Sequence, residues 1–168
     1  MGPLVDAEAR DRVHRYIDLG KKEGATVVLD GRNTDSLRES VARCPNGCFV
    51  GPTIIDHCRP GMSVIEDEIF GPVLSVMREA TLDAAIANVN RSKYGNMAVI
   101  FTSSGHDARR FRTHIDAGML GINVGVPAPM AAFPFSGWKQ SFFGDLHANG
   151  EDGPKFFTKS KVCVARWL

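Results

Sequence analysis

Residues 81–124 read TLDAAIANVNRSKYGNMAVIFTSSGHDARRFRTHIDAGMLGINV, and this stretch decides the fold class. Its first helix is predicted by apolar residues at i, i+3, i+4 and i+7 after a capping threonine: Leu82, Ala85, Ile86 and Val89. The apolar runs at 97–103 and 119–124 predict strands, and residues 106–117 between them predict a second helix. A helix–strand–helix–strand order is typical of an α/β layer with parallel strands.

The residues before this stretch extend the same pattern. Residues 7–19 predict a helix, and the apolar runs at 25–31 and 72–77 predict strands, the first of them buried. Residues 31–47 are polar and rich in turn formers, so we expect a loop with at most one helical turn, followed by an extended run at 49–55. The predicted fold is α/β, a largely parallel sheet with flanking helices.

The C-terminal part has a different character. Residues 125–145 combine prolines, glycines and aromatics, which predicts a segment that covers a surface or lines a pocket. The last residues, KVCVARWL, alternate in polarity and predict a terminal strand that needs a partner edge.

Composition limits the possible functions. The 168 residues are 43% apolar and 23% charged, which is ordinary for one globular domain. The net charge is +1, with acids and bases mixed along the chain, so we expect neither nucleic acid nor a membrane as a partner. With no secretion signal visible, a cytoplasmic location is predicted.

Cysteine and histidine offer further candidate sites. CPNGC at 44–48 resembles a small disulfide loop or metal knuckle, but no second pair completes a metal site, so reduced thiols and no metal are expected. Cys58 lies beside His57, where a lowered thiol pKa is conceivable. His14 and His114 fall on polar helix faces and are expected to be solvated. In DLH at 145–147, a turn capped by Asp145 is favoured over an acid–base pair.

EDEIFGPV at 66–73 places three acids against an aromatic, a glycine and a proline. Taken alone, this is typical of a solvated acidic turn with a buried phenylalanine. The segment nevertheless resembles the Glu-Glu-Ile-Phe-Gly-Pro signature of the aldehyde dehydrogenase superfamily. The short motifs MGPL, FVGPTII, YG and GINV occur along the chain in the same order as in that family. PFSGWKQSFFGDLHANG at 134–150, with GINVGVPAPMAAFPFSG, is similar to the CoA-acylating methylmalonate-semialdehyde (malonate-semialdehyde) dehydrogenase branch.

The resemblance implies a fold and site residues. Residues 1–150 would be the C-terminal portion of the family's catalytic domain, and residues 151–168 would be an oligomerisation strand. Glu68 would accept hydrogen bonds from both hydroxyls of the nicotinamide ribose, with the Phe70 ring packed nearby. Phe135 would line the aldehyde pocket, although core packing remains an alternative for that ring.

The resemblance also implies a reaction. A cysteine thiolate attacks the aldehyde, hydride passes to NAD, and the thioester is handed to CoA with loss of CO₂. The family's nucleophile, oxyanion-hole asparagine and glycine-rich nucleotide half precede MGPL. We therefore assign no catalytic residue to this chain and expect a C-terminal piece, inactive alone, of a homo-oligomeric enzyme that converts malonate or methylmalonate semialdehyde. Two alternatives remain open: a non-catalytic α/β interaction module, and a different enzyme using Cys58 with His57.

Overall fold

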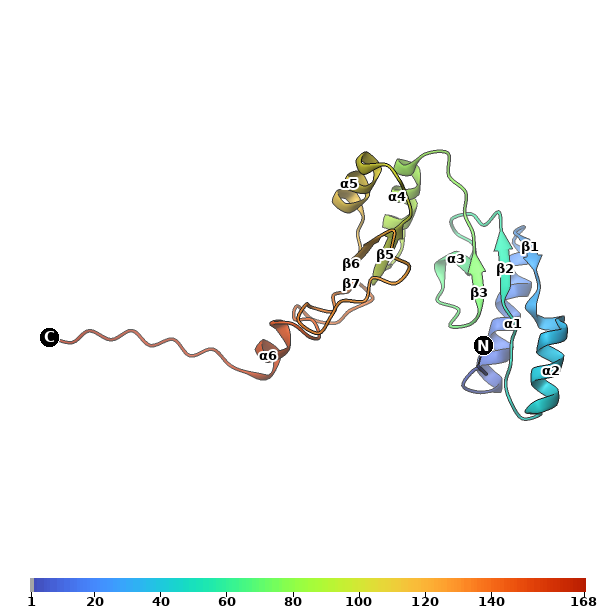
Figure 1. Cartoon of the computed structure of the whole chain (residues 1–168), viewed down its shortest axis with the longest axis horizontal. Coiled ribbons are helices and arrows are strands. Elements are labelled where there is room, and N and C mark those ends of the chain that lie inside the picture. Colours follow the sequence, from blue (N-terminus) through green and yellow to red (C-terminus); the bar gives the residue numbers. More distant parts are fainter. Residues whose placement is uncertain (1) are drawn as a thin grey trace. The chain divides into compact units, whose positions relative to one another are not determined.

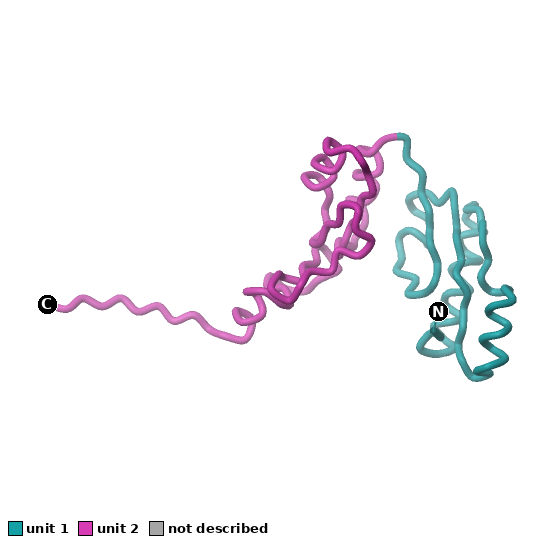
Figure 2. The backbone as a smooth tube through the Cα atoms, in the orientation of Figure 1, with its two compact units in different colours: residues 1–80 teal, residues 81–168 magenta. Residues whose placement is uncertain are grey.

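The computed structural model describes residues 2–168. The chain divides after residue 80 into two compact units, coloured teal and magenta in Figure 2. Met1, the first residue of the MGPL motif, lies outside the described residues. The expected division after residue 150 into a catalytic portion and an oligomerisation strand stays a prediction.

The first unit is a helix packed on a three-stranded sheet. The sheet order is β1-β2-β3, with β1 antiparallel and β3 parallel to the central β2. Its elements are labelled in Figure 1: α1 (Ala7–Lys22), β1 (Thr26–Leu29), η1 (Gly31–Asn33), α2 (Asp35–Arg43), β2 (Thr53–Asp56), α3 (Ser63–Glu66) and β3 (Val73–Ser75).

The core of this unit lies between α1 and β2. Asp6 caps α1 by accepting a hydrogen bond from the Ala9 N–H at 2.7 Å. Val13 and Ile17 of α1 and Ile55 of β2 are fully buried. Burying an aliphatic side chain of this size contributes roughly 1.5–3 kcal/mol, so these three side chains anchor the helix to the sheet.

Two predictions for this unit are wrong. β1 is not buried, because it is an edge strand with β2 as its only strand neighbour in the described sheet, and Val28 and Leu29 are exposed. Residues 31–47 are not mainly a loop, since they contain η1 and the nine-residue helix α2. Thr34 caps α2 by accepting from the Leu37 N–H at 3.3 Å.

The second unit contains two small sheets and three helices among the described residues. β5 and β6 pair in parallel, and β4 and β7 pair antiparallel. The elements are α4 (Leu82–Arg91), β4 (Tyr94–Gly95), β5 (Met97–Ile100), α5 (Gly105–His114), β6 (Met119–Ile122), β7 (Trp138–Lys139) and α6 (Asp152–Phe157) (Figure 1). Buried Ile86, Phe111 and Ile115 form its core against β5 and β6. The predicted α/β class is confirmed.

The chain ends without regular structure. Residues 158–168 are exposed and belong to no helix or strand, and Figure 1 draws them as an extended tail. Within residues 2–168 this segment pairs with no strand edge, so the terminal strand and its partner edge stay a prediction. Among the helices of residues 2–168, none has the length and apolar character needed to cross a membrane.

The two helical histidines differ in their surroundings. His114 is exposed, as predicted. The prediction for His14 is wrong, because its Nε2 atom is buried and has no hydrogen-bond partner among the described residues. Arg32 of η1 reaches back to α1, where it pairs with Asp18 at 2.7 Å, and also pairs with Asp30 at 2.6 Å. Burial, followed by the positive charge of Arg32, lowers the pKa of His14.

Candidate functional site

The EDEIFGPV segment forms the turn between α3 and β3, and its side chains alternate in exposure. Ile69 is only 8% exposed and belongs to the core of the first unit, whereas Phe70 is 70% exposed. Glu68 is also exposed. The turn therefore presents a carboxylate and a phenyl ring to solvent on either side of one buried anchor.

The three acids of this turn have different roles. Glu66 Oε1 accepts a hydrogen bond from the Gly61 N–H at 2.9 Å, and Asp67 Oδ2 accepts one from the Tyr16 hydroxyl at 3.2 Å. The Glu68 carboxylate forms no hydrogen bond or ion pair within residues 2–168. Two of the acids thus hold the turn in place, and Glu68 is the one whose oxygens are open to a ligand.

The backbone of Phe70 is strained. Its φ is +54°, in the left-handed region that bulky residues rarely adopt. Such a conformation costs on the order of 1–3 kcal/mol and persists only where the surroundings impose it. Here the buried Ile69 on one side and the close contact of Gly71 on the other fix the backbone, and the ring is turned outward as a result.

Gly71 permits the close approach of this turn to α1. A Cβ atom at this position would lie 2.3 Å from Cγ2 of the fully buried Val13, which no side chain could tolerate without movement. The Gly71 carbonyl then accepts from the Val73 N–H at 2.8 Å across Pro72, at the start of β3. The turn thus packs against α1 at Gly71 and continues into β3 at Val73.

The base of the turn is held from a third direction. Glu23, at the C-terminal end of α1, accepts hydrogen bonds from the Ser63 N–H at 2.8 Å and the Ser63 hydroxyl at 2.5 Å. These bonds join α1 to the first residue of α3, which precedes the acidic turn. A site built on elements fixed in this way keeps its geometry before a ligand arrives.

This arrangement fits a sugar diol beside a flat ring. Two adjacent hydroxyl donors match the two oxygens of one carboxylate, and charge-assisted bonds of this kind are strong. The exposed Phe70, two residues after Glu68, offers an apolar ring face. The residues present therefore fit the nicotinamide ribose of NAD.

Phe135 lies in the second unit, whereas Glu68 and Phe70 share one turn of the first. Its side chain is half-buried, and its N–H donates to the Ala148 carbonyl at 2.6 Å, forming an isolated bridge between two loop segments. The ring is thus neither enclosed in the core nor fully open to solvent.

His147 organises the loops around Phe135, a role that the sequence did not reveal. Asp152 Oδ2 accepts from the His147 N–H at 3.2 Å and lies 3.4 Å from its Nδ1. The Nε2 atom lies 3.3 Å from the Gly137 carbonyl oxygen and 3.4 Å from the Ser136 hydroxyl. The expectation of a turn capped by Asp145 is wrong, since Asp152, five residues beyond His147, supplies the carboxylate.

The hypothesis of a thiol site at Cys58 and His57 is also wrong. Cys58 is buried and its Sγ–H donates to the Ile55 carbonyl at 3.4 Å, whereas His57 is exposed. Burial raises the pKa of the Cys58 thiol, which is the opposite of what an activated nucleophile requires.

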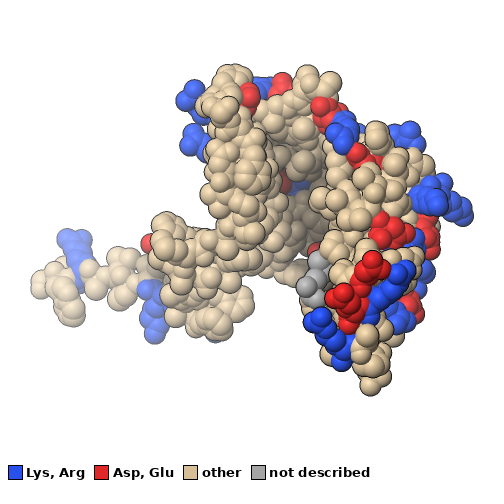
Figure 3. All heavy atoms as spheres, turned by 45° about the vertical axis from the view of Figure 1, so that its right-hand side comes forward, with Lys and Arg blue, Asp and Glu red and all other residues tan. Residues whose placement is uncertain are grey.

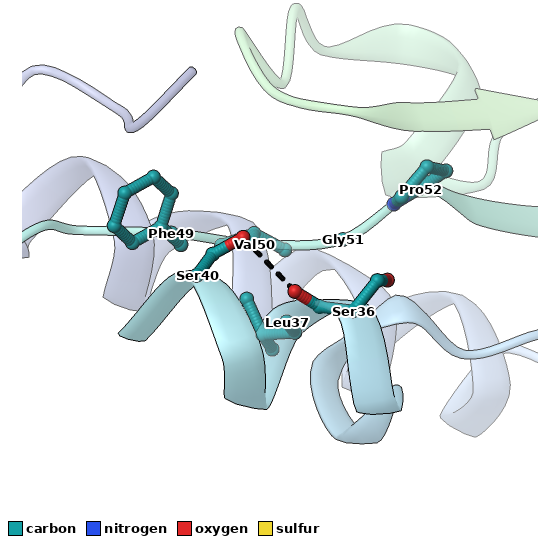
Figure 4. A pocket seen from close by; sticks show the side chains of 7 residues that line it. All are labelled: Ser36, Leu37, Ser40, Phe49, Val50, Gly51 and Pro52. Carbon is teal, nitrogen blue, oxygen red and sulfur yellow. Dashed lines mark hydrogen bonds between the residues drawn. The ribbon is translucent and has the colours of Figure 1, made fainter. Parts of the chain in front are cut away.

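A hollow of about 300 Å³ lies elsewhere in the first unit (Figure 4). The sequence does not predict this hollow, because one of its walls is α2, in a segment whose sequence predicts a loop. Its lining residues are uncharged and include none of the predicted site residues: Ser36, Leu37, Ser40, Phe49, Val50, Gly51 and Pro52.

Charge on the surface is mixed. Figure 3 shows Lys and Arg side chains interspersed with Asp and Glu on the face in view, in keeping with the net charge of +1. That face offers no single-sign patch for a polyanionic partner.

Comparison with known proteins identifies the class. The model of the aldehyde dehydrogenase family matches residues 1–163, and the chain belongs to this family. Among curated relatives, it is 52% identical over 167 residues to malonate-semialdehyde dehydrogenase 2 of Geobacillus kaustophilus and 54% identical to malonate-semialdehyde dehydrogenase 3 of the same organism. Each alignment covers 99% of this chain and 33% of the relative, so the chain spans about a third of these relatives' length.

Solved structures give the same picture. Methylmalonate-semialdehyde dehydrogenase from Oceanimonas doudoroffii matches 99% of this chain and 33% of its own, with a TM-score of 0.87 and 42% identity. A structure described as methylmalonate-semialdehyde dehydrogenase from Sinorhizobium meliloti complexed with NAD matches 100% of this chain and 33% of its own length, with a TM-score of 0.92 and 41% identity. Betaine aldehyde dehydrogenase from Staphylococcus aureus in complex with NAD⁺ matches 94% of this chain and 30% of its own length, with a TM-score of 0.82 and 32% identity.

Proposed function

We propose that this chain forms part of an NAD-dependent, CoA-acylating oxidoreductase that converts malonate or methylmalonate semialdehyde to acetyl-CoA or propionyl-CoA with loss of CO₂. The observation that carries the proposal is the turn at residues 66–73. Among residues 2–168, it leaves the Glu68 carboxylate without a hydrogen-bond or ion-pair partner, and it holds Phe70 outward in a left-handed conformation. The names of the malonate- and methylmalonate-semialdehyde relatives support the substrate class.

Glu68 and Phe70 have distinct roles in this proposal. The Glu68 carboxylate accepts hydrogen bonds from the two hydroxyls of the nicotinamide ribose, and the Phe70 ring packs beside that sugar and the nicotinamide. NAD, when bound, supplies the acceptor for the hydride that leaves the substrate. The chain's own contribution is orientation, which depends on the fixed backbone of the turn.

Phe135 is proposed to line the aldehyde pocket. Its side chain is half-buried, and its backbone pairs with Ala148, the residue that follows His147. Replacing Phe135 by alanine in an active enzyme should raise KM for the semialdehyde more than KM for NAD. Equal effects on both would favour the alternative of plain core packing.

The 168-residue chain alone is expected to oxidise no semialdehyde. Cys58 is buried with a raised thiol pKa, and no base contacts the thiols of Cys44, Cys48 or Cys163 within the described residues. The reaction needs a thiolate, so the remainder of the catalytic machinery has to come from elsewhere.

A chimaera tests the proposal. Residues 1–168 would replace the corresponding third of malonate-semialdehyde dehydrogenase 2 of Geobacillus kaustophilus, and NADH and acyl-CoA formation would be followed with malonate and methylmalonate semialdehyde. We expect CoA-dependent turnover of at least one substrate and none by the chain alone. A folded chimaera that binds NAD but forms no acyl-CoA from either substrate would overturn the proposed activity.

A second candidate function is a non-catalytic interaction module of the same fold. The exposed apolar residues of the tail favour it: Val162, Val164 and Trp167 are each more than 85% exposed and suit pairing with another subunit. Assembly of the chain without any NAD binding, in the chain or in the chimaera, would favour this candidate over the enzyme. A homo-oligomer is proposed in either case.

A further inference from the structure

The CPNGC motif forms a closed turn between α2 and β2. The Gly47 N–H donates to the Cys44 carbonyl at 2.9 Å, with Pro45 and Asn46 at the two central positions. Proline at the first central position and glycine at the last are preferred in type I turns. The motif is therefore a pre-shaped short turn with a cysteine at its first residue and another directly after its last.

Both ends of this turn are fixed by the fold. The Cys44 N–H donates to the Ser40 carbonyl at 3.0 Å and ends α2. The Cys48 carbonyl accepts from the Leu4 N–H at 2.8 Å, which ties that cysteine to the N-terminal segment. A Cβ on Gly47 would lie 2.2 Å from the Phe49 ring, so a larger residue where the chain leaves the turn would have to displace that ring.

The two thiols are available. Cys44 is exposed and Cys48 is half-buried, both are free, and neither thiol forms a hydrogen bond within residues 2–168. Cys58 differs in both respects, since it is buried and donates to a carbonyl oxygen. Cys163 is exposed but belongs to the other unit and has no second cysteine close in sequence.

We propose that Cys44 and Cys48 form a reversible dithiol–disulfide site that reacts with low-molecular-weight disulfides such as glutathione disulfide. One thiolate attacks the disulfide, an S–S bond to the protein forms, and one glutathione leaves as its thiol. The other cysteine then attacks the protein sulfur of this mixed disulfide and releases the second glutathione. In total the two thiols lose two protons and two electrons, and one glutathione disulfide takes them up to become two glutathione molecules.

The bond would cross-link two walls of the hollow shown in Figure 4. Ser40 lies one helical turn before Cys44, and Phe49 directly follows Cys48, and both residues line that hollow. The disulfide would fix the end of α2 to the segment that leads into β2. Because it closes only a five-residue loop, it gains little from loop closure and stays easy to reduce.

The experiment uses the whole chain in glutathione redox buffers, followed by acid quenching, alkylation of free thiols and peptide mass analysis. The peptide with Cys44 and Cys48 should lose about 2 Da through an internal bond, whereas Cys163, which has no resolving thiol, should keep a glutathione adduct. In a Cys44→Ser variant, Cys48 has no resolving thiol nearby and should keep a glutathione adduct instead of forming the internal disulfide. Stable adducts on both Cys44 and Cys48 of the wild-type chain would overturn the proposal.

A comparison with the unfolded chain isolates the contribution of the fold. The same equilibrium would be measured on wild-type protein in urea, with unfolding verified by circular dichroism. If the folded turn brings the thiols together, the ratio of disulfide to dithiol should be roughly tenfold higher in buffer than in urea. An equal or lower ratio in buffer would show that the fold holds them apart and would contradict the proposal.

Discussion

Phe70 and Ile69 are neighbours whose side chains contribute very differently to the stability of the fold. Replacing exposed Phe70 by glycine removes a strained left-handed backbone, so the free energy of unfolding should change by no more than about 1 kcal/mol. The same replacement of buried Ile69 should cost at least about 2–5 kcal/mol. Urea denaturation of both variants checks this. Equal losses would mean that the Phe70 ring is part of the core.

His14 should make stability sensitive to acid. Its folded-state pKa lies below the ordinary 6.5 because of burial and the charge of Arg32. The unfolded chain therefore binds the proton more readily, so the stability contributed by neutral His14 is complete above pH 6.5 and declines as pH falls through the folded-state pKa.

Replacing His14 by glutamine should flatten the dependence of unfolding free energy on pH between about pH 7 and pH 5. Replacing exposed His114 by glutamine is the matched control and should leave the slope as in the wild type. Identical slopes in all three proteins would remove His14 as the cause.

At the same scale, the sequence was informative about Glu68 only through its motif. Three consecutive acids cannot be separated by spacing, and it is the contacts of Glu66 with Gly61 and of Asp67 with Tyr16 that leave Glu68 open. Tyr16 is 51 positions from Asp67 in the sequence, so no local sequence pattern predicts the hydrogen bond between them. The strain at Phe70 was equally invisible, because it arises from the packing of its neighbours.

At the scale of elements, the seating of the acidic turn on α1 should depend on one close contact. Replacing Gly71 by alanine would push a methyl group into Val13 and destabilise the first unit by about 1–3 kcal/mol. Val13→Ala, which is destabilising alone, should relieve part of that effect in the double variant. A double-mutant cycle by urea denaturation measures the coupling, and strict additivity would show that the two residues do not meet.

Helices with a clear apolar face were predictable, and those without one were not. The apolar pattern of Leu82, Ile86 and Val89 predicts α4, and the observed bounds of that helix, Leu82–Arg91, agree with the pattern. The sequence does not predict α2 because its apolar face is limited to Leu37 and Val41, and the helix buries none of its residues. The apolar residues of β1 predict a buried strand, but sequence does not show that a strand lies at the edge of a sheet.

For the whole molecule, the tail should drive self-association. Val164 and Trp167 are 94% and 93% exposed, and apolar surface of this kind promotes association. Light scattering after size exclusion should show a mass above that of the monomer that falls on dilution. Removing residues 159–168 should shift the population toward monomer. A wild-type chain that stays monomeric at every concentration would contradict this prediction.

The central claim concerns the Glu68 carboxylate, and NAD titration of the chimaera by calorimetry tests it most directly. Glu68→Gln keeps the shape but loses a charge-assisted bond to the ribose diol, a change worth about 1.5–3 kcal/mol, so Kd for NAD should rise roughly ten- to a hundredfold. Glu66→Gln changes the same charge two residues away and can still accept from Gly61, so its Kd should match the wild type. Unchanged NAD affinity in Glu68→Gln would contradict the account.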